Sequence, residues 1–255
     1  MKLVLLGDPV EHSRSPAIHT AALDASGIGG SYVARRVDRA GMVSAVAEIR
    51  YGALDGANVT MPHKETAFSL VDRVSEHGLR AGAINTIAHQ SGMAAGDNTD
   101  IDGLRMVWAA AALNTEAPIL ILGSGGAAAA ALVALAERRI SIAARTPEAA
   151  EALLRRTRVD GGVVEWGTAI AGAVVVNATP IGMSGESLPV GIIEAAVGLV
   201  DLPYAAAPTP AVVSAGEHGM PFADGRDVLV AQAAASFELW AGVAAPLQAM
   251  RAAAT

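Results

Sequence analysis

Short apolar segments alternate with longer amphipathic stretches along almost the whole chain of 255 residues. This alternation is typical of βαβ units and predicts an α/β fold with mainly parallel sheets. Two helix starts carry their own signals, Ser15-Pro16 and Thr146-Pro147-Glu148, and in the second Thr146 would be the N-cap. The predicted strands are residues 3–6, 32–37, 54–60, 84–88, 119–122, 140–143, 174–176 and 199–201.

The size of the chain allows more than one domain. Hydrophobic residues make up 52% and charged residues 17%, which suits a large buried core and excludes disordered, collagen-like and coiled-coil proteins. A short polar stretch at residues 114–118 precedes a strongly apolar strand, so we place a domain boundary at or slightly before it. The sequence therefore predicts two α/β domains.

The charge and the cysteine content of the chain exclude several classes of partner and site. Eighteen basic against 25 acidic residues give a net charge of −7 without a basic run, so nucleic acid is not an expected partner. The absence of cysteine excludes disulfides, thiolate metal sites and a thiol nucleophile. No segment reaches the roughly 20 apolar residues that span a bilayer, and the apolar N-terminus is too short for a signal peptide. We expect a soluble, cytoplasmic protein with no membrane partner.

A glycine-rich turn in the second half predicts a dinucleotide site. The strand at residues 119–122 runs directly into this turn, and an alanine-rich helix follows. Glycines allow a tight turn and the close approach of a pyrophosphate, whose charge is favoured at a helix N-terminus. A plain tight turn is the alternative. The predicted cofactor-binding residues of the turn are Gly123, Ser124, Gly125, Gly126 and Ala127.

The residue after the next strand indicates which dinucleotide binds. An NAD site places an acidic residue there, about 20 positions beyond the glycines, to hold the ribose hydroxyls. This chain has Arg145 followed by Thr146, a pair that suits the 2′-phosphate of NADP. A solvated surface arginine is the alternative interpretation.

Polar turns in the first half predict a small-molecule site. Ser13 and Ser15 precede a helix, where they could hydrogen-bond a carboxylate; an N-cap role is the alternative for Ser15 but does not explain Ser13. Lys64 follows a strand, although lysine is usually a solvated surface residue. Asn-Thr pairs at 85–86 and 98–99 end further elements, and ordinary turn chemistry could account for each alone. Together, these turns should converge where α/β sheets bind ligands.

Seven motifs in this order resemble those of the shikimate dehydrogenase family, over essentially the whole chain. The motifs are residues 12–16, 58–64, 82–86, 98–100, 123–127, 177–180 and 232–240. The resemblance implies a substrate-binding domain of residues 1–101 plus 227–255 and a Rossmann-type NADP-binding domain of residues 102–226. It also implies reversible, NADPH-dependent reduction of 3-dehydroshikimate to shikimate in aromatic amino-acid biosynthesis.

The same resemblance implies roles for individual residues. Lys64 and Asp100 would be catalytic, with Asp100 also contacting the substrate. Ser13 and Ser15 would hold the substrate carboxylate, and Tyr204 would line the pocket. The ring hydroxyls would contact Thr60, Asn85 and Gln232, and the nicotinamide half of NADP would lie near Thr179, Leu202 and Gly225. No metal is expected, and a monomer or homodimer is expected.

Two departures from the family pattern concern the cofactor site. Ala144 stands where the family has an asparagine before the arginine, and no second basic residue follows Arg145 within a few positions. Residues 226–229 replace a largely apolar stretch that includes a methionine. Quinate or aminoshikimate dehydrogenase activity remains an alternative, because those ligands share the carboxylate and ring hydroxyls. A dinucleotide-binding sensor without turnover is a more distant one.

Overall fold

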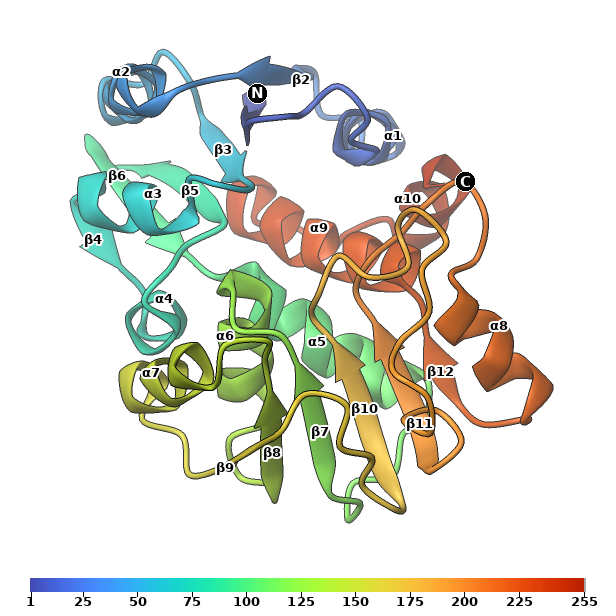
Figure 1. Cartoon of the computed structure of the whole chain (residues 1–255). Coiled ribbons are helices and arrows are strands. Elements are labelled where there is room, and N and C mark those ends of the chain that lie inside the picture. Colours follow the sequence, from blue (N-terminus) through green and yellow to red (C-terminus); the bar gives the residue numbers. More distant parts are fainter. Residues whose placement is uncertain (255) are drawn as a thin grey trace. The chain divides into compact units, whose positions relative to one another are not determined.

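The computed structural model describes residues 1–254 and separates into two compact units (Figure 1). The first comprises Met1–Gly103 and the segment that begins at Leu229, and the second comprises Leu104–Val228. The division falls inside helix α5 (Thr99–Ala110), so the polar stretch at residues 114–118 lies within the second unit. The first unit is therefore discontinuous in sequence, whereas the second is continuous.

The first unit is built on a mixed sheet with the strand order β2-β1-β3-β5-β6-β4. Only β5 runs antiparallel to its neighbours, because β5 and β6 form a hairpin with a two-residue turn at Ser91-Gly92. The predicted mainly parallel arrangement is confirmed, with β5 as the exception. The bounds are β1 (Lys2–Gly7), β2 (Ser31–Arg36), β3 (Gly56–Val59), β4 (Arg73–Val74), β5 (Thr86–Gln90) and β6 (Met93–Asp97).

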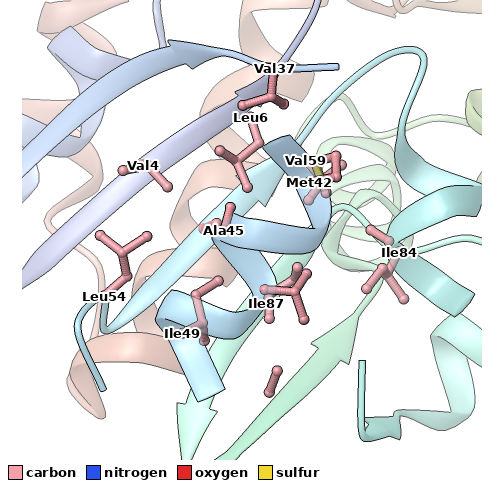
Figure 2. Close-up of a cluster of buried hydrophobic side chains, with 14 residues drawn as sticks. Val4, Leu6, Val37, Met42, Ala45, Ile49, Leu54, Val59, Ile84 and Ile87 are labelled. Carbon is pink, nitrogen blue, oxygen red and sulfur yellow. The ribbon is translucent and has the colours of Figure 1, made fainter. Parts of the chain in front are cut away.

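Helices cover both faces of this sheet, and the alternation along β1 shows how. Val4 and Leu6 point into a core with α2 and α3 (Figure 2), whereas Leu3 and Leu5 point into a cluster on the opposite face that includes Tyr32. Buried apolar side chains on both faces fix the strand register. The helices are α1 (Ser15–Ala25), α2 (Arg39–Arg50), α3 (Lys64–Leu70), α4 (Glu76–Ala81), α9 (Gly225–Ala241, mostly in this unit) and α10 (Leu247–Ala253).

The second unit has a fully parallel sheet with the order β12-β11-β10-β7-β8-β9. This is the doubly wound order. From β7 the chain adds β8 and β9 on one side, and it then returns to add β10, β11 and β12 on the other side, so the order of the strands reverses between β7 and β10. The elements are β7 (Ile119–Leu122), α6 (Gly126–Ala134), β8 (Ile140–Ala143), α7 (Pro147–Thr157), β9 (Gly162–Val164), β10 (Ala173–Asn177), β11 (Ala196–Asp201), α8 (Pro210–Glu217) and β12 (Phe222–Ala223).

The predicted strands are confirmed, whereas the predictions for the helix starts are confirmed only in part. Each predicted strand is present; the strands predicted at residues 119–122 and 140–143 have the predicted bounds, and the other six have shifted ends. Strands β4, β6, β9 and β12 are additional. Arg14 is the N-cap of α1, so the N-cap interpretation of Ser15 is wrong. Thr146 is the N-cap of α7 as predicted, but its side chain makes no capping hydrogen bond. Across residues 1–254, each helix is too short or too polar to cross a membrane.

Candidate active site

A lysine and an aspartate form a close ion pair in the first unit. Lys64 begins α3 and Asp100 lies in the first turn of α5, and Lys64 Nζ is 2.6 Å from Asp100 Oδ2. Asn85 Nδ2 donates a hydrogen bond to the other oxygen, Asp100 Oδ1, at 2.7 Å. The N-terminus of α5 also favours a carboxylate at this place. Both carboxylate oxygens therefore have a donor, and the ammonium group is held at a fixed position.

The β5–β6 hairpin brings these distant residues together. Thr86 at the start of β5 pairs with Asn58 of β3 on one side and with Asp97 of β6 on the other. Asn85 therefore lies beside the end of β6, from which the chain enters α5. Two backbone hydrogen bonds fix the arrangement: Ile84 N donates to Lys64 O at 3.1 Å, and Asn85 N donates to Asp97 O at 3.0 Å.

A buried polar network lies beneath the ion pair. The hydroxyls of Thr86, Thr99 and Ser236 are each 2.9 Å from one another. Thr99 N donates to Asn85 Oδ1 at 2.8 Å, which orients the amide that contacts Asp100. Thr86, Thr99 and Ser236 are functional residues that were not predicted from the sequence. The two Asn-Thr pairs were a usable signal for the threonines.

Helix α9 contributes to the same network. Asn85 Nδ2 is 3.4 Å from Gln232 Oε1, and Ser236, one turn later, donates to Gln232 O at 3.0 Å. Asn58 Nδ2 lies 2.9 Å from Ser236 Oγ and 3.0 Å from Thr86 Oγ1. The predicted residues Lys64, Asp100, Asn85 and Gln232 are therefore brought together by direct contacts.

The two predicted anchor serines lie at the start of α1. Ser13 Oγ accepts a hydrogen bond from Ser15 N at 3.2 Å, so its own proton remains available for donation. Ser15 is buried; burial raises the pKa of Tyr32, and the Ser15 side chain opposes this effect. Tyr32 donates to Asn58 Oδ1 at 2.8 Å, which connects Tyr32 to the network.

The loop with the serines also contacts the loop that leads to Lys64. Asp8 N donates to Met61 O at 3.0 Å, and Thr60 N donates to Leu6 O at 2.8 Å. Thr60, a predicted substrate contact, therefore lies between the two loops at the end of β3.

His19 lies behind this site as a buried, neutral side chain. Its ring stacks on Tyr32 at 4.4 Å, and it is 1% exposed. Burial lowers the pKa of His19 from 6.5 to about 3. The nearby Asn58 acts in the opposite direction, although no hydrogen bond of normal geometry joins the two in the described structure.

This burial predicts a loss of stability in acid. Below pH 6.5 His19 becomes protonated in the unfolded chain but not in the folded chain. The free energy of unfolding therefore falls as the pH drops below 6.5, until the pH reaches the pKa of His19 in the folded chain, about 3. We expect this histidine to account for about 3 kcal/mol of lost stability at about pH 4.5. Urea unfolding above pH 6.5 and at about pH 4.5 measures this difference in the free energy of unfolding. His19→Gln should flatten the dependence, whereas exposed His12→Gln should not; parallel curves for all three proteins would contradict the assignment.

The second unit places the glycine turn at the N-terminus of α6. Gly123 has φ of 114°, and a Cβ there would lie 2.8 Å from Ala178 O, so only glycine suits this position. Gly125 is the N-cap of α6, is exposed and has open space around it. Ser124, Gly126 and Ala127 are half-buried beside it. The first turn of α6 has no acidic residue, so its free amides and dipole fit a pyrophosphate.

Arg145 and Thr146 are both exposed at the carboxyl end of β8, next to the strand that leads to the glycine turn. Ala144, just before them, is buried. An exposed guanidinium at this edge fits the 2′-phosphate of NADP.

The remaining predicted cofactor residues follow β10 and β11. Thr179 donates through its backbone N and its Oγ1 to Asn177 Oδ1, at 3.1 and 2.6 Å. Leu202 N donates to Asn177 O at 3.0 Å. Gly225 approaches the same segment so closely that a Cβ would lie 2.4 Å from Pro203 O. Thr179, Leu202 and Gly225 are therefore linked through neighbouring loops.

Tyr204 lies in the second unit, apart in sequence from the other predicted substrate residues. It lines a small pocket together with Pro208, Asp224 and Arg226. Arg226, one of the departures from the family pattern, donates to Ala205 O and Ala206 O at 3.1 and 3.0 Å. No cluster of three or more His, Asp or Glu side chains that could hold a metal occurs in residues 1–254.

Fold and site together define an α/β protein with a doubly wound, dinucleotide-type unit and a second unit that holds a lysine–aspartate pair. Residues 5–87 match the family model described as the shikimate dehydrogenase substrate binding domain, and residues 225–255 match the shikimate 5′-dehydrogenase C-terminal domain.

Individual relatives match over nearly the full length. The chain is 38% identical to shikimate dehydrogenase (NADP(+)) of Acidiphilium cryptum, over 94% of this chain and 90% of the relative. It is 37% identical to that of Gluconobacter oxydans, over 94% and 89%. The solved shikimate 5-dehydrogenase from Thermus thermophilus, in complex with NADP(H) and shikimate, superposes with a TM-score of 0.91 at 34% identity, covering 100% of this chain and 98% of that one. The chain belongs to the shikimate dehydrogenase family, which confirms the predicted family and fold class.

Proposed function

We propose that this chain is an NADP-dependent oxidoreductase that reversibly reduces 3-dehydroshikimate to shikimate. The observation that carries the proposal is the Lys64–Asp100 ion pair, held at 2.6 Å and oriented by Asn85. The predicted enzyme class, activity and cofactor are confirmed by relatives named shikimate dehydrogenase (NADP(+)), and a solved relative holds NADP(H) and shikimate.

Lys64 suits the proton chemistry of this reaction. When bound, the nicotinamide supplies the hydride. A ketone that accepts a hydride develops negative charge on its oxygen and needs a proton, and the ammonium of Lys64 is both a donor and a positive charge. Asp100 holds the ammonium in place, and Asn85 holds Asp100. The chain thus keeps the proton donor oriented before the substrate binds.

The substrate contacts are proposed from the same geometry. Ser13 and Ser15 would bind the carboxylate with their hydroxyls at the positive end of α1. Thr60, Asn85 and Gln232 would contact the ring hydroxyls, and Tyr204 would line the pocket.

The proposed contacts to the cofactor come from residues of the second unit. The turn at residues 123–127 would hold the pyrophosphate at α6, and Arg145 with Thr146 would hold the 2′-phosphate. Thr179, Leu202 and Gly225 would surround the nicotinamide half. The open N-cap and the close approaches at Gly123 and Gly225 support this placement.

We also propose a substrate domain of residues 1–101 plus 227–255 and a cofactor domain of residues 102–226. The two compact units, which divide after Gly103 and Val228, support these limits. A cytoplasmic location and a monomeric or dimeric state stay predictions.

Steady-state assays that follow NADPH absorbance test the proposal. The purified chain should oxidise shikimate with NADP at a higher kcat/KM than quinate with either NADP or NAD. A preference for quinate with NAD would instead support the quinate-type alternative. Binding of NADP without turnover of either acid would support the sensor alternative.

Cofactor choice should depend on Arg145. It is exposed at the end of β8, and a charged hydrogen bond to a phosphate contributes about 1.5 to 3 kcal/mol, so NADP should be preferred over NAD by tens of fold. Arg145→Ala should nearly abolish the preference, and added salt should weaken it in the wild type. The kcat/KM values for both cofactors measure it.

A matched control is available just before the same strand. Arg139 is exposed at the opposite end of β8, so Arg139→Ala should leave the NADP/NAD ratio unchanged. A wild type that prefers NAD, or an Arg145→Ala protein that keeps the wild-type ratio, would contradict the NADP role of Arg145.

A further inference from the structure

Asp201, the last residue of β11, is a fully buried carboxylate that the proposed reaction does not use. We propose that Asp201 is a positioning residue that orients Thr179 through Asn177 and holds the Tyr204 loop through Thr209. This inference rests on the proposed function, because Thr179 and Tyr204 are assigned there to the nicotinamide half of NADP and to the substrate.

The first contact fixes the orientation of an amide. Asn177 Nδ2 donates to Asp201 Oδ1 at 2.7 Å and to Ile181 O at 3.1 Å. Both partners only accept, so the NH₂ group of Asn177 must face them. Asn177 Oδ1 is thereby left to accept from Thr179 N and Thr179 Oγ1. The carboxylate thus determines which way the amide points and, through it, the position of Thr179.

The second contact closes a loop. Thr209 Oγ1 donates to Asp201 Oδ2 and accepts from Val212 N at 3.3 Å, at the start of α8. Asp201 and Thr209 are the two ends of the segment that carries Leu202 and Tyr204. One buried carboxylate therefore holds both ends of this segment and the loop after β10.

An amide at position 201 could not make both contacts. A carboxylate offers two accepting oxygens, whereas an asparagine offers one oxygen and an NH₂ group that would face a second donor. Burial raises the pKa of Asp201, with the hydrogen bonds from Thr209 and Asn177 opposing this, so the chain keeps a costly group here. Asp201→Asn preserves the size of the side chain while it removes the ionisable group and replaces one of the two accepting oxygens by an NH₂ donor.

Binding of two ligands by the full-length chain tests the inference. Titration calorimetry with NADP+ and with adenosine 2′,5′-bisphosphate, which lacks the nicotinamide, separates the two halves of the site. For Asp201→Asn we expect the Kd of NADP+ to rise on the order of tenfold and kcat to fall, while the Kd of the bisphosphate stays within about twofold. A merely structural role would weaken both ligands equally.

Two further variants complete the test. Thr157→Val removes a buried hydroxyl of α7 that bonds only backbone carbonyls, so it should lower Tm and leave both Kd values unchanged. Thr209→Val removes the contact to Asp201 and the cap of α8 but leaves the Asn177–Asp201 contact in place, so the KM of shikimate should rise while the Kd of NADP+ stays within about threefold. If Asp201→Asn does not fold, the difference between these two effects in Thr209→Val still tests the inference.

Several results would overturn the inference. Equal weakening of both ligands in Asp201→Asn, no weakening of either, or an unchanged KM of shikimate in Thr209→Val would each do so. A wild type that fails to bind NADP+ would overturn the proposed function itself, which is a distinguishable result.

Discussion

Replacement of Lys64 by alanine should lower kcat by a factor of at least about one hundred while shikimate still binds with a Kd within about tenfold of the wild-type value. Lys64 Nζ lies 2.6 Å from Asp100 Oδ2, and its charge would act on an oxygen that becomes negative only during the reaction. The loss should therefore fall on the chemical step more than on ground-state binding. Stopped-flow or steady-state rates and direct shikimate titration measure the two quantities.

The chain offers clean controls, because it has only two lysines. Lys2→Ala, at an exposed position on β1, should leave kcat unchanged. Lys64→Arg keeps a positive charge but holds its proton too tightly to donate it, so it should recover binding without recovering most of kcat. Parallel loss of binding and turnover in Lys64→Ala would argue against the proton-donor role.

Changing Ser13 and Ser15 together to alanine should raise the KM of shikimate on the order of one hundredfold, with kcat at saturation changed by less than about threefold. Each hydrogen bond to a charged group contributes about 1.5 to 3 kcal/mol, which is roughly tenfold or more per hydroxyl. The reacting carbonyl is served by Lys64 and not by the serines, so the rate at saturation should be spared. Steady-state kinetics over a wide shikimate range measure both parameters.

A double control with the same chemistry is Ser44→Ala with Ser69→Ala. Both hydroxyls are exposed and bond only to carbonyls of their own helices, Ala40 O at 3.3 Å and Thr66 O at 2.7 Å. Their loss should not alter the KM of shikimate. An unchanged KM in the Ser13/Ser15 variant would place the substrate carboxylate elsewhere.

The central strands of the second unit could be predicted from the sequence more closely than those of the first, although its short edge strands β9 and β12 were missed. Its strands are apolar runs in a parallel sheet, and the glycine turn identifies the central strand. In the first unit β6 is Met-Ala-Ala-Gly-Asp, which lacks the β-branched and aromatic residues that mark strands. The reversed direction of β5 follows from its hairpin with β6, so missing β6 also hid that reversal.

The candidate site was partly predictable for a related reason. Lys64, Asn85 and Asp100 stand at element ends, where local patterns locate them, and the structure brings them into contact. Ser236 lies in the middle of α9 and bonds Asn58, 178 positions earlier. No local pattern reports a contact of that length, because it depends on how α9 packs against the sheet.

The interrupted sequence of the first unit determines the order in which the chain matures during synthesis. The second unit is continuous and is complete once Val228 has emerged, whereas the first lacks α9 until then. Until α9 arrives, the amide of Asn58 and the hydroxyls of Thr86 and Thr99 lack Ser236, and Ile87 O lacks the indole of Trp240. Since domains generally fold as units while the chain is made, we expect the second unit to fold around its own core before the first unit is complete. The first unit, whose N-terminal part leaves the ribosome first, should therefore be the last to complete its fold.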